Sequence, residues 1–253
     1  PFMKILITGG AGFVGARLAR TLLARGTLDG QRITQLVIAD QAPAPADLAA
    51  DARVQGRTGK LLAQVQGLRD EAFDSVFHLA SAVSGECEAD FELGLHSNLD
   101  STRALLDALR HRVEQGGKPA KLVFSSSVAV FGPDPAVPFA GIVADDTLPT
   151  PQTSYGTHKL ICEHLVADYT RKGYIDGRAA RLMTVTVRPG KPNGAASSFF
   201  SGIIREPLAG VESVCPVSPE VSHPMASPSQ TVDGLITVYE ASREDFFGRL
   251  ALN

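Results

Sequence analysis

A glycine-rich turn constrains the fold of this chain more than any other sequence feature. The turn, Gly9-Gly10-Ala11-Gly12-Phe13-Val14-Gly15, directly follows an aliphatic, β-branched run at residues 4–8 and precedes a helical apolar pattern. This order is typical of a dinucleotide-binding unit: Gly9 can take the tight turn, Gly12 lets the backbone approach a pyrophosphate, and Gly15 lets the helix pack on the strand. The helix N-terminus then favours the anion, although such a turn also occurs in other α/β proteins.

An acid at the end of the next strand pattern indicates which dinucleotide would bind. Residues 35–39 form a second buried-strand run, which ends in Asp40. A carboxylate at this place suits the ribose diol of NAD and would repel the 2′-phosphate of NADP. No arginine follows it in residues 41–43. We therefore predict NAD as the cofactor; the alternative is that Asp40 is simply a solvated acid at a strand end.

Strand and helix patterns alternate along the rest of the chain. Further strand patterns lie at residues 54–56, 75–82, 121–124 and 183–187. Helix patterns lie at about residues 89–113, 153–172 and 231–242, and residues 193–229 are rich in Pro, Ser and Gly, which predicts loops over a cleft. Five or six buried strands alternating with helices predict an α/β fold with a doubly wound parallel sheet. We expect residues 1–188 to bind the dinucleotide and residues 189–253 to cover the substrate.

Composition and charge exclude several classes of partner. A net charge of -3 gives no electrostatic reason to expect nucleic acid or an anionic membrane as a partner. Cys87, Cys162 and Cys215 are scattered without metal-like spacing, and the histidines form no HxH or HExxH motif. No apolar run approaches the length of a membrane span. We therefore expect a cytoplasmic protein with a small-molecule substrate and no bound metal.

Tyr155 and Lys159 form a candidate proton-transfer pair. They lie four residues apart in a helical pattern and therefore share one helix face. A phenol beside an ammonium is a possible general base, because the positive charge favours the phenolate. Lowering a phenol pKa from about 10 to neutrality requires roughly 4 kcal/mol of differential stabilisation. A solvated lysine alone cannot supply it, whereas a desolvated site with a second positive charge, such as an oxidised nicotinamide, can.

Taken together, these segments resemble the extended short-chain dehydrogenase/reductase superfamily over essentially the whole chain. The matching segments are residues 8–15, 78–81, Asn98, 125–132, 155–159 and 188–190. The resemblance implies a Rossmann fold, NAD as cofactor, and a homodimer that pairs through the helices near residues 89–113 and 153–172. Residues 187–199 further resemble members that oxidise a four-carbon sugar acid. A small sugar acid, oxidised at its 2-hydroxyl group, is therefore the implied substrate.

The resemblance also implies roles for single residues. Tyr155 takes the hydroxyl proton, Ser127 orients the reacting oxygen, and Lys159 lowers the pKa of Tyr155 and holds the nicotinamide ribose. The implied cofactor-binding residues are Gly9, Gly12, Phe13, Val14, Gly15, Asp40, Leu79, Ala80, Ser81, Asn98, Tyr155, Lys159, Pro189 and Gly190. Candidates for contact with the substrate are Ser81, Ser84, Ser127, Lys191, Asn193, Ser198 and Arg205. His158 points to another helix face and is interpreted as structural.

Two departures from the superfamily pattern bear on these expectations. Members usually carry an acid after the third strand that contacts the adenine, but residues 57–62 read Arg-Thr-Gly-Lys-Leu-Leu here. Extended members are also usually longer than this chain, so we expect the substrate-covering region to be incomplete. The alternative functions are a nucleotide-sugar epimerase or dehydratase that retains NAD, and a redox-sensing binding protein without catalysis. The second alternative has no need for Ser127, Tyr155 and Lys159 together.

Overall fold

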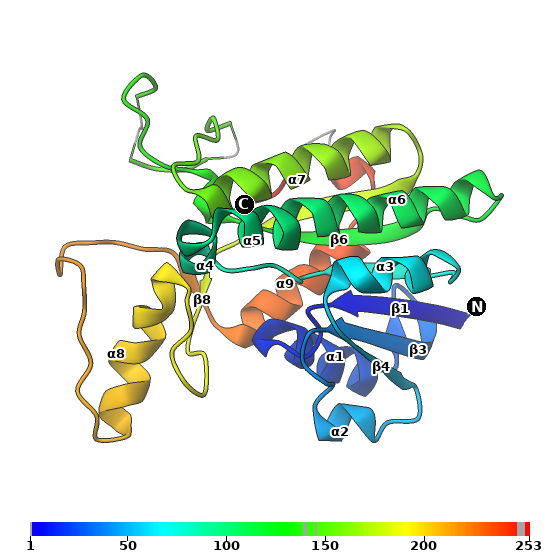
Figure 1. Cartoon of the computed structure of the whole chain (residues 1–253), viewed down its shortest axis with the longest axis horizontal. Helices are drawn as coiled ribbons and strands as arrows, with labels where there is room; N and C mark the ends of the chain where they lie inside the picture. Colours follow the sequence, from blue (N-terminus) through cyan, green and yellow to red (C-terminus); the bar gives the residue numbers. More distant parts are fainter. Residues whose placement is uncertain (1, 139–140, 145, 247–250) are drawn as a thin grey trace.

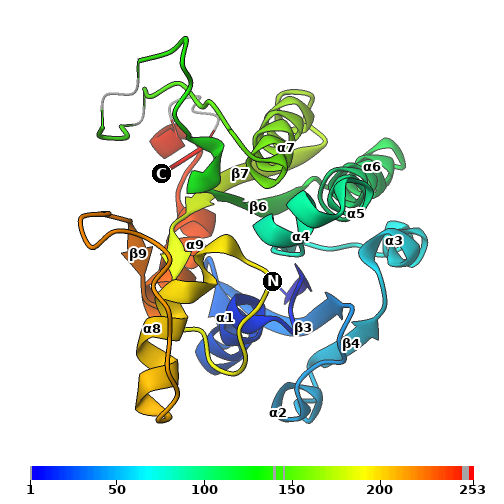
Figure 2. The ribbon, with the colours of Figure 1, turned by 60° about the vertical axis from the view of Figure 1, so that its left-hand side comes forward.

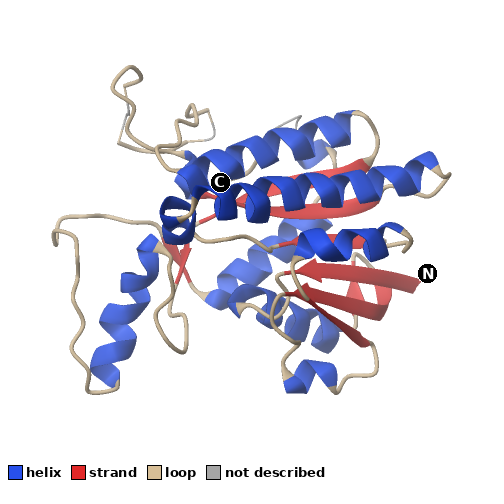
Figure 3. Cartoon of the chain, viewed as in Figure 1, coloured by secondary structure: helices blue, strands red, loops and turns tan. Residues whose placement is uncertain are grey.

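The computed structural model describes residues 2–138, 141–144, 146–246 and 251–253. Strands and helices alternate along most of this chain (Figures 1 and 3). The strands are β1 (Phe2–Thr8), β2 (Thr27–Leu28), β3 (Gln31–Asp40), β4 (Val54–Thr58), β5 (Ser75–His78), β6 (Ala120–Ser127), β7 (Ile175–Leu182), β8 (Thr184–Val185) and β9 (Met225–Ala226). The helices are α1 (Phe13–Arg25), α2 (Ala46–Ala49), α3 (Leu61–Arg69), α4 (Ser84–Ala89), α5 (Phe91–Gly94), α6 (Ser101–Glu114), α7 (Ser154–Arg171), α8 (Phe199–Leu208) and α9 (Pro228–Glu240).

The main sheet has the strand order of a doubly wound dinucleotide-binding fold. Its parallel strands lie in the order β4-β3-β1-β5-β6-β7, and the short β2 pairs antiparallel with β3. Thr8 at the end of β1 is aligned with Ala39 of β3 and His78 of β5. The chain changes winding direction between β1 and β5, and ligands bind beyond the carboxyl ends of strands at such a switch point. The predicted fold class is confirmed.

Helices cover both faces of this sheet, because side chains of a strand alternate between its faces. Ile5 and Ile7 of β1 belong to one buried cluster with residues of α1 and α9. Leu6, between them, belongs to a second cluster with residues of α3, α6 and α7. The two helix layers are visible on opposite sides of the strands in Figure 2. Burial on both faces explains why the strands read as continuous apolar runs.

The strand predicted at residues 183–187 is wrong in position. The strand beside β6 is β7, Ile175–Leu182, and its pattern is interrupted by two arginines. Both arginines are buried, with Arg178 beside Asp176 and Arg181 paired with Glu163 of α7. The strand is not evident from hydropathy, because the buried ion pair of Arg181 and Glu163 stands where an apolar contact would be expected. Residues 184–185 form β8, which pairs with β9 outside the main sheet.

The prediction of one long helix at residues 89–113 is also wrong in detail. The segment is divided into α4, α5, a π-helical stretch at Leu95–Asp100, and α6. The wider π turn leaves the carbonyl oxygen of Asn98 available to side chains. It accepts hydrogen bonds from Thr102 Oγ1 at 2.5 Å and from Cys162 Sγ at 3.5 Å. The break therefore connects α6 with α7.

The region predicted as loops at residues 193–229 contains α8 and β9. Helix α8 lies beside the carboxyl edge of the sheet and is flanked by long loops (Figure 3). Helix α9, predicted near residues 231–242, packs against the sheet with α1. In the described part of the chain, no helix has the length and apolar character needed to cross a membrane.

The buried ion pair of Glu163 and Arg181 gives a stability prediction. Arg181→Leu leaves the fully buried Glu163 carboxylate without its cation. The free energy of unfolding should fall by about 3–5 kcal/mol, as measured by urea denaturation. Glu163→Leu in the same chain should restore much of the loss, because no isolated charge then remains. Arg171→Leu is the control, since its partner Asp168 is exposed and little change is expected. Equal losses of stability in Arg181→Leu and in the control Arg171→Leu would contradict the prediction.

Candidate active site

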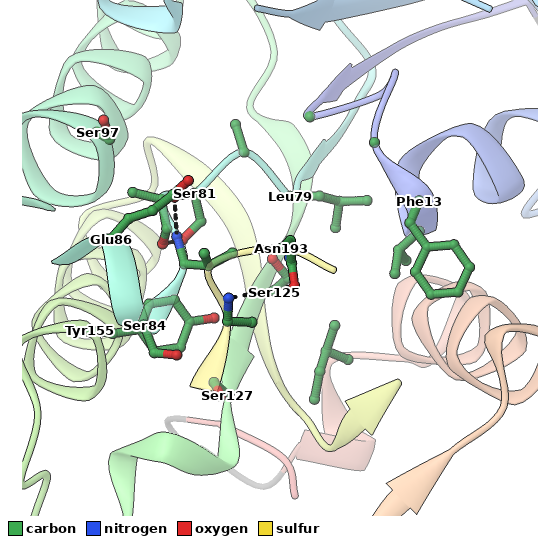
Figure 4. Close-up of a pocket in the computed structure, with 18 of the residues that line it drawn as sticks. Phe13, Leu79, Ser81, Ser84, Glu86, Ser97, Ser125, Ser127, Tyr155 and Asn193 are labelled. Carbon is green, nitrogen blue, oxygen red and sulfur yellow. Dashed lines mark hydrogen bonds between the residues drawn. The ribbon is translucent and has the colours of Figure 1, made fainter. Parts of the chain in front are cut away.

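A cavity of about 1200 Å³ lies at the carboxyl edge of the sheet. It is lined by the glycine turn, the ends of β3 and β6, the loop after β5, the starts of α4 and α7, and parts of the segment from Leu182 to Arg205. Figure 4 shows Phe13 at one end and Tyr155, Ser127 and Glu86 toward the other. This volume exceeds that of most single-ligand pockets and suits a dinucleotide together with a small substrate.

The glycine turn provides a close-fitting cradle at the start of α1. Gly9 has a φ of +70°, and its amide donates to the Ala39 carbonyl at 2.8 Å. A Cβ atom on Gly15 would lie 2.1 Å from the Gly9 carbonyl oxygen, so only glycine fits there. The first amides of α1 have no partner within their own helix. Gly9, Gly12, Phe13, Val14 and Gly15 all line the cavity, as expected for residues that hold a pyrophosphate.

Asp40 is fixed at the far end of the same cradle. Its carboxylate accepts hydrogen bonds from the amides of Ala11 and Ala42, each at 3.0 Å. Gly59, Lys60, Leu61 and Leu62 line the cavity nearby, where superfamily members usually carry an acid. The residues around the cradle therefore fit a dinucleotide. Within the described ranges, no cluster of His, Cys, Asp or Glu could hold a metal ion.

The structure brings the predicted catalytic residues together. Ser127 ends β6, and Tyr155 lies in the first turn of α7, whose amide at Gly156 donates to Thr153 Oγ1. Lys159 is 3% exposed, and its Nζ lies 5.4 Å from the centre of the Tyr155 ring. A Cβ on Gly156 would lie 2.1 Å from the Ala129 carbonyl oxygen, so this glycine lets α7 approach the turn after Ser127. Ser127 also accepts a hydrogen bond from the Ala129 amide at 3.1 Å.

The ammonium of Lys159 lies in the desolvated setting that the proton-transfer hypothesis requires. Nζ donates to the carbonyl of Ser125 at 2.7 Å and lies 4.9 Å from the centre of the Phe124 ring. Ser126 donates to Glu163, one turn further along α7, and Glu163 is held in turn by Arg181. Helix α7 is thereby fixed to β6 and β7 through buried polar contacts.

His78 links the cofactor turn to the broken helix. Nδ1 lies 2.6 Å from Thr8 Oγ1, and Nε2 lies 2.8 Å from Thr102 Oγ1. Because the Thr102 hydroxyl donates to the Asn98 carbonyl, it accepts from His78, and Nε2 therefore carries the proton. Burial and the nearby charge of Lys159 lower the pKa of His78 to about 3. The ring is therefore neutral, and its role is to hold Thr8 and Thr102 in place through hydrogen bonds.

Asn98 acts on the loop after β5 and does not line the cavity. Its Oδ1 accepts from the Ala82 amide at 2.7 Å and from the Ser81 hydroxyl at 3.1 Å. Its Nδ2 donates to the Ala82 carbonyl at 3.2 Å. The direct cofactor contact expected of Asn98 is therefore not supported. Leu79, Ala80 and Ser81 of this loop and Ser84 at the start of α4 do line the cavity as predicted.

The segment after β8 departs most from the predictions. Pro189, Gly190 and Lys191 are exposed and lie outside the cavity lining, because residues 193–196 dock on α4 instead. The Gly85 amide donates to the Gly194 carbonyl at 2.9 Å, and the Ala196 amide donates to Ser84 Oγ at 2.9 Å. Asn193, Ser198 and Arg205 do line the cavity. The structure adds lining residues that were not among the candidates for the site: Glu86, Thr184, Arg188, Ser197, Ser201 and His223.

Comparison with known proteins identifies the family. The model of the NAD dependent epimerase/dehydratase family matches residues 5–220. The chain belongs to this family. Within it, the chain is 49% identical over 258 residues to D-erythronate dehydrogenase of Cupriavidus necator, covering 99% of this chain and 76% of that relative. It is 42% identical to the D-erythronate dehydrogenase of Haemophilus influenzae, covering 92% and 71%.

A solved structure shows the same fold. The nucleoside-diphosphate-sugar epimerase from Agrobacterium tumefaciens superimposes with a TM-score of 0.90 and 42% identity, covering 99% of this chain and 72% of that one. Together with the two dehydrogenases, the family match confirms an NAD-dependent dehydrogenase of the short-chain dehydrogenase/reductase type.

His78 gives a prediction for stability against pH. In the folded protein its pKa is about 3, whereas in the unfolded chain it takes a proton below about pH 6.5. Proton uptake therefore favours the unfolded state as the pH falls through this window. The free energy of unfolding should drop by roughly 2 kcal/mol more in the wild type than in His78→Gln between pH 7 and pH 4.5.

Urea denaturation at these two pH values measures the difference. The exposed His164, changed to Gln, is the control and should leave the pH dependence of the wild type unaltered. A His78→Gln protein that loses as much stability on acidification as the wild type would contradict the proposed burial of the neutral ring.

Proposed function

We propose that the protein oxidises the 2-hydroxyl group of a small sugar acid, converting D-erythronate to 2-oxo-erythronate with NAD as the oxidant. The observation that carries the proposal is that Ser127, Tyr155 and Lys159 all line the cavity at the carboxyl edge of the sheet, together with the glycine turn. The substrate class is supported by the 49% identity with a D-erythronate dehydrogenase over 99% of the chain.

The side chains of this cavity can perform the proton transfer. Bound NAD supplies the hydride acceptor for the carbon that carries the hydroxyl group. Tyr155 takes the hydroxyl proton on its phenolic oxygen, and the Lys159 ammonium favours the phenolate from its dry position. Ser127 donates to the reacting oxygen and orients it. The Ser125 carbonyl keeps Lys159 from turning away to solvent.

Asp40 favours NAD over NADP in this proposal. Its carboxylate is held by the amides of Ala11 and Ala42 and cannot easily withdraw from a 2′-phosphate. Residues 1–188 would bind the cofactor and residues 189–253 would cover the substrate. Helix α9 of the second part packs on the sheet, so the two parts share one hydrophobic core and differ only in their proposed roles. The homodimer and the cytoplasmic location stay predictions.

Incubation with D-erythronate and NAD tests the proposed reaction. We expect NADH to accumulate steadily, with NAD giving a higher kcat/KM than NADP. A panel of other sugar acids, assayed in the same way, defines the range of substrates. Cofactor that remains bound through turnover without net reduction would instead indicate an epimerase or dehydratase. A preference for NADP would contradict the role given to Asp40.

Tyr155→Phe tests the identity of the base. Turnover should fall by about 10²–10⁴-fold, because the variant has no phenolic oxygen to take the proton. Affinity for NAD, measured by calorimetry, should stay close to that of the wild type. Tyr174→Phe removes a phenolic hydroxyl beyond the end of α7 and should retain full activity. Normal turnover by Tyr155→Phe would overturn the assignment.

A further inference from the structure

The cavity contains one strong anchor for an anionic group that the proposed chemistry has not used. In the described part of the chain, the Lys and Arg residues that line the cavity are Lys60, Lys159, Arg188 and Arg205. Lys60 lies with Gly59 and Leu61 beyond β4, on the dinucleotide side. Lys159 is buried on the Ser125 carbonyl beside the base. The choice for a substrate carboxylate therefore lies between the two arginines.

Arg205, one of the predicted candidates, is already neutralised. Its guanidinium forms an ion pair with the adjacent Glu206, with Nε 3.1 Å from the carboxylate. Nη1 also donates to the carbonyl oxygen of Arg188 at 2.6 Å. A guanidinium with its donors directed at a carboxylate and a carbonyl has little left to offer a second anion. Arg205 is instead suited to hold Arg188 in place.

Arg188 has the opposite character. Its backbone is held on both sides by α8, because its amide donates to Ser201 Oγ at 2.9 Å and its carbonyl accepts from Arg205. Its guanidinium has no hydrogen-bond or ion-pair partner among the residues that the structure describes. A fixed backbone with an unpaired guanidinium at a cavity is prepared for a carboxylate, which arginine binds through two parallel hydrogen bonds.

The rest of the lining agrees with an anionic group at this position. Ser198 and Ser201 of α8 and its preceding turn also line the cavity, and Ser201 Oγ accepts from the Arg188 amide. The acid Glu86 belongs to a different element, α4, where its Oε2 accepts from the Val83 amide at 2.9 Å. A carboxylate near Glu86 would meet a like charge, whereas a hydroxyl group could donate to it.

We propose that Arg188 binds the carboxylate of the substrate, while Glu86, which lines the cavity from α4, faces its hydroxyl groups. This inference rests on the proposed oxidation of a sugar acid and names the group that selects for the acid. It replaces the earlier candidates Lys191, which is exposed, and Arg205, which is engaged. The enzyme should then discriminate against neutral polyols and amides of the same carbon skeleton.

Arg188→Met, Arg188→Lys and the control Lys191→Met test the proposal with D-erythronate and its neutral amide, D-erythronamide. Arg188→Met should raise the KM for D-erythronate roughly 10- to 100-fold, since a charge-assisted hydrogen-bonded pair is lost. The KM for the amide should change little. Arg188→Lys should recover part of the affinity, because lysine keeps the positive charge but cannot form the two parallel hydrogen bonds of a guanidinium. Lys191→Met should match the wild type throughout.

Glu86→Gln provides a change in the opposite direction. Removal of the like charge should lower the KM for D-erythronate or leave it unchanged, and a higher KM would contradict the placement of the carboxylate. An unchanged KM for D-erythronate in Arg188→Met would overturn the inference. An equal loss for acid and amide would do the same, because it would indicate a structural role.

Calorimetric binding of D-erythronate to the protein with NAD separates this inference from the proposed function. If the wild type binds the acid without oxidising it, the function is wrong, but loss of binding in Arg188→Met still supports the anchor. If the wild type oxidises the acid and Arg188→Met binds it equally well, the function stands and the anchor is wrong. If the wild type neither binds nor oxidises it, both are wrong.

Discussion

The buried ammonium of Lys159 is the constraint on which the active site depends. A cation with 3% of its surface exposed is costly unless its donors are satisfied, and here a carbonyl oxygen and two aromatic rings surround it. The carbonyl belongs to Ser125 of β6, so α7 must lie at a fixed height above that strand. Tyr155, one turn earlier on α7, is then placed beside Ser127 at the end of the same strand.

Two polar networks keep this arrangement from relaxing. Behind Lys159, Glu163 joins Ser126 and Arg181, which fixes α7 against two neighbouring strands. On the cofactor side, His78 connects the end of β1 with the π turn, whose Asn98 shapes the loop after β5. The dinucleotide cradle and the catalytic residues are therefore parts of one connected structure, as a reaction between cofactor and substrate requires.

Much of the site could be predicted, because its residues follow one another at strand ends or along a helix face. The glycine turn, Asp40 and the pair of Tyr155 and Lys159 line the cavity as expected. Asn98 was among the expected cofactor-binding residues, but its hydrogen bonds to Ala82 depend on a π turn, which no local sequence pattern indicates. Lys191 is a candidate by its charge, but it is exposed and lies outside the cavity lining, since Gly194 docks on α4.

The sequence by itself determined the alternation of strands and helices in the dinucleotide-binding part, the glycine turn and the candidate base. These depend on the conformational freedom of glycine and on apolar periodicity, both of which act over a few residues. Tertiary structure decided the position of β7, which hides two arginines, and the walls of the substrate end. Glu86, Arg188 and His223 meet there from distant segments. Contacts between such distant segments follow from the packing of whole elements, so a local sequence pattern cannot predict them.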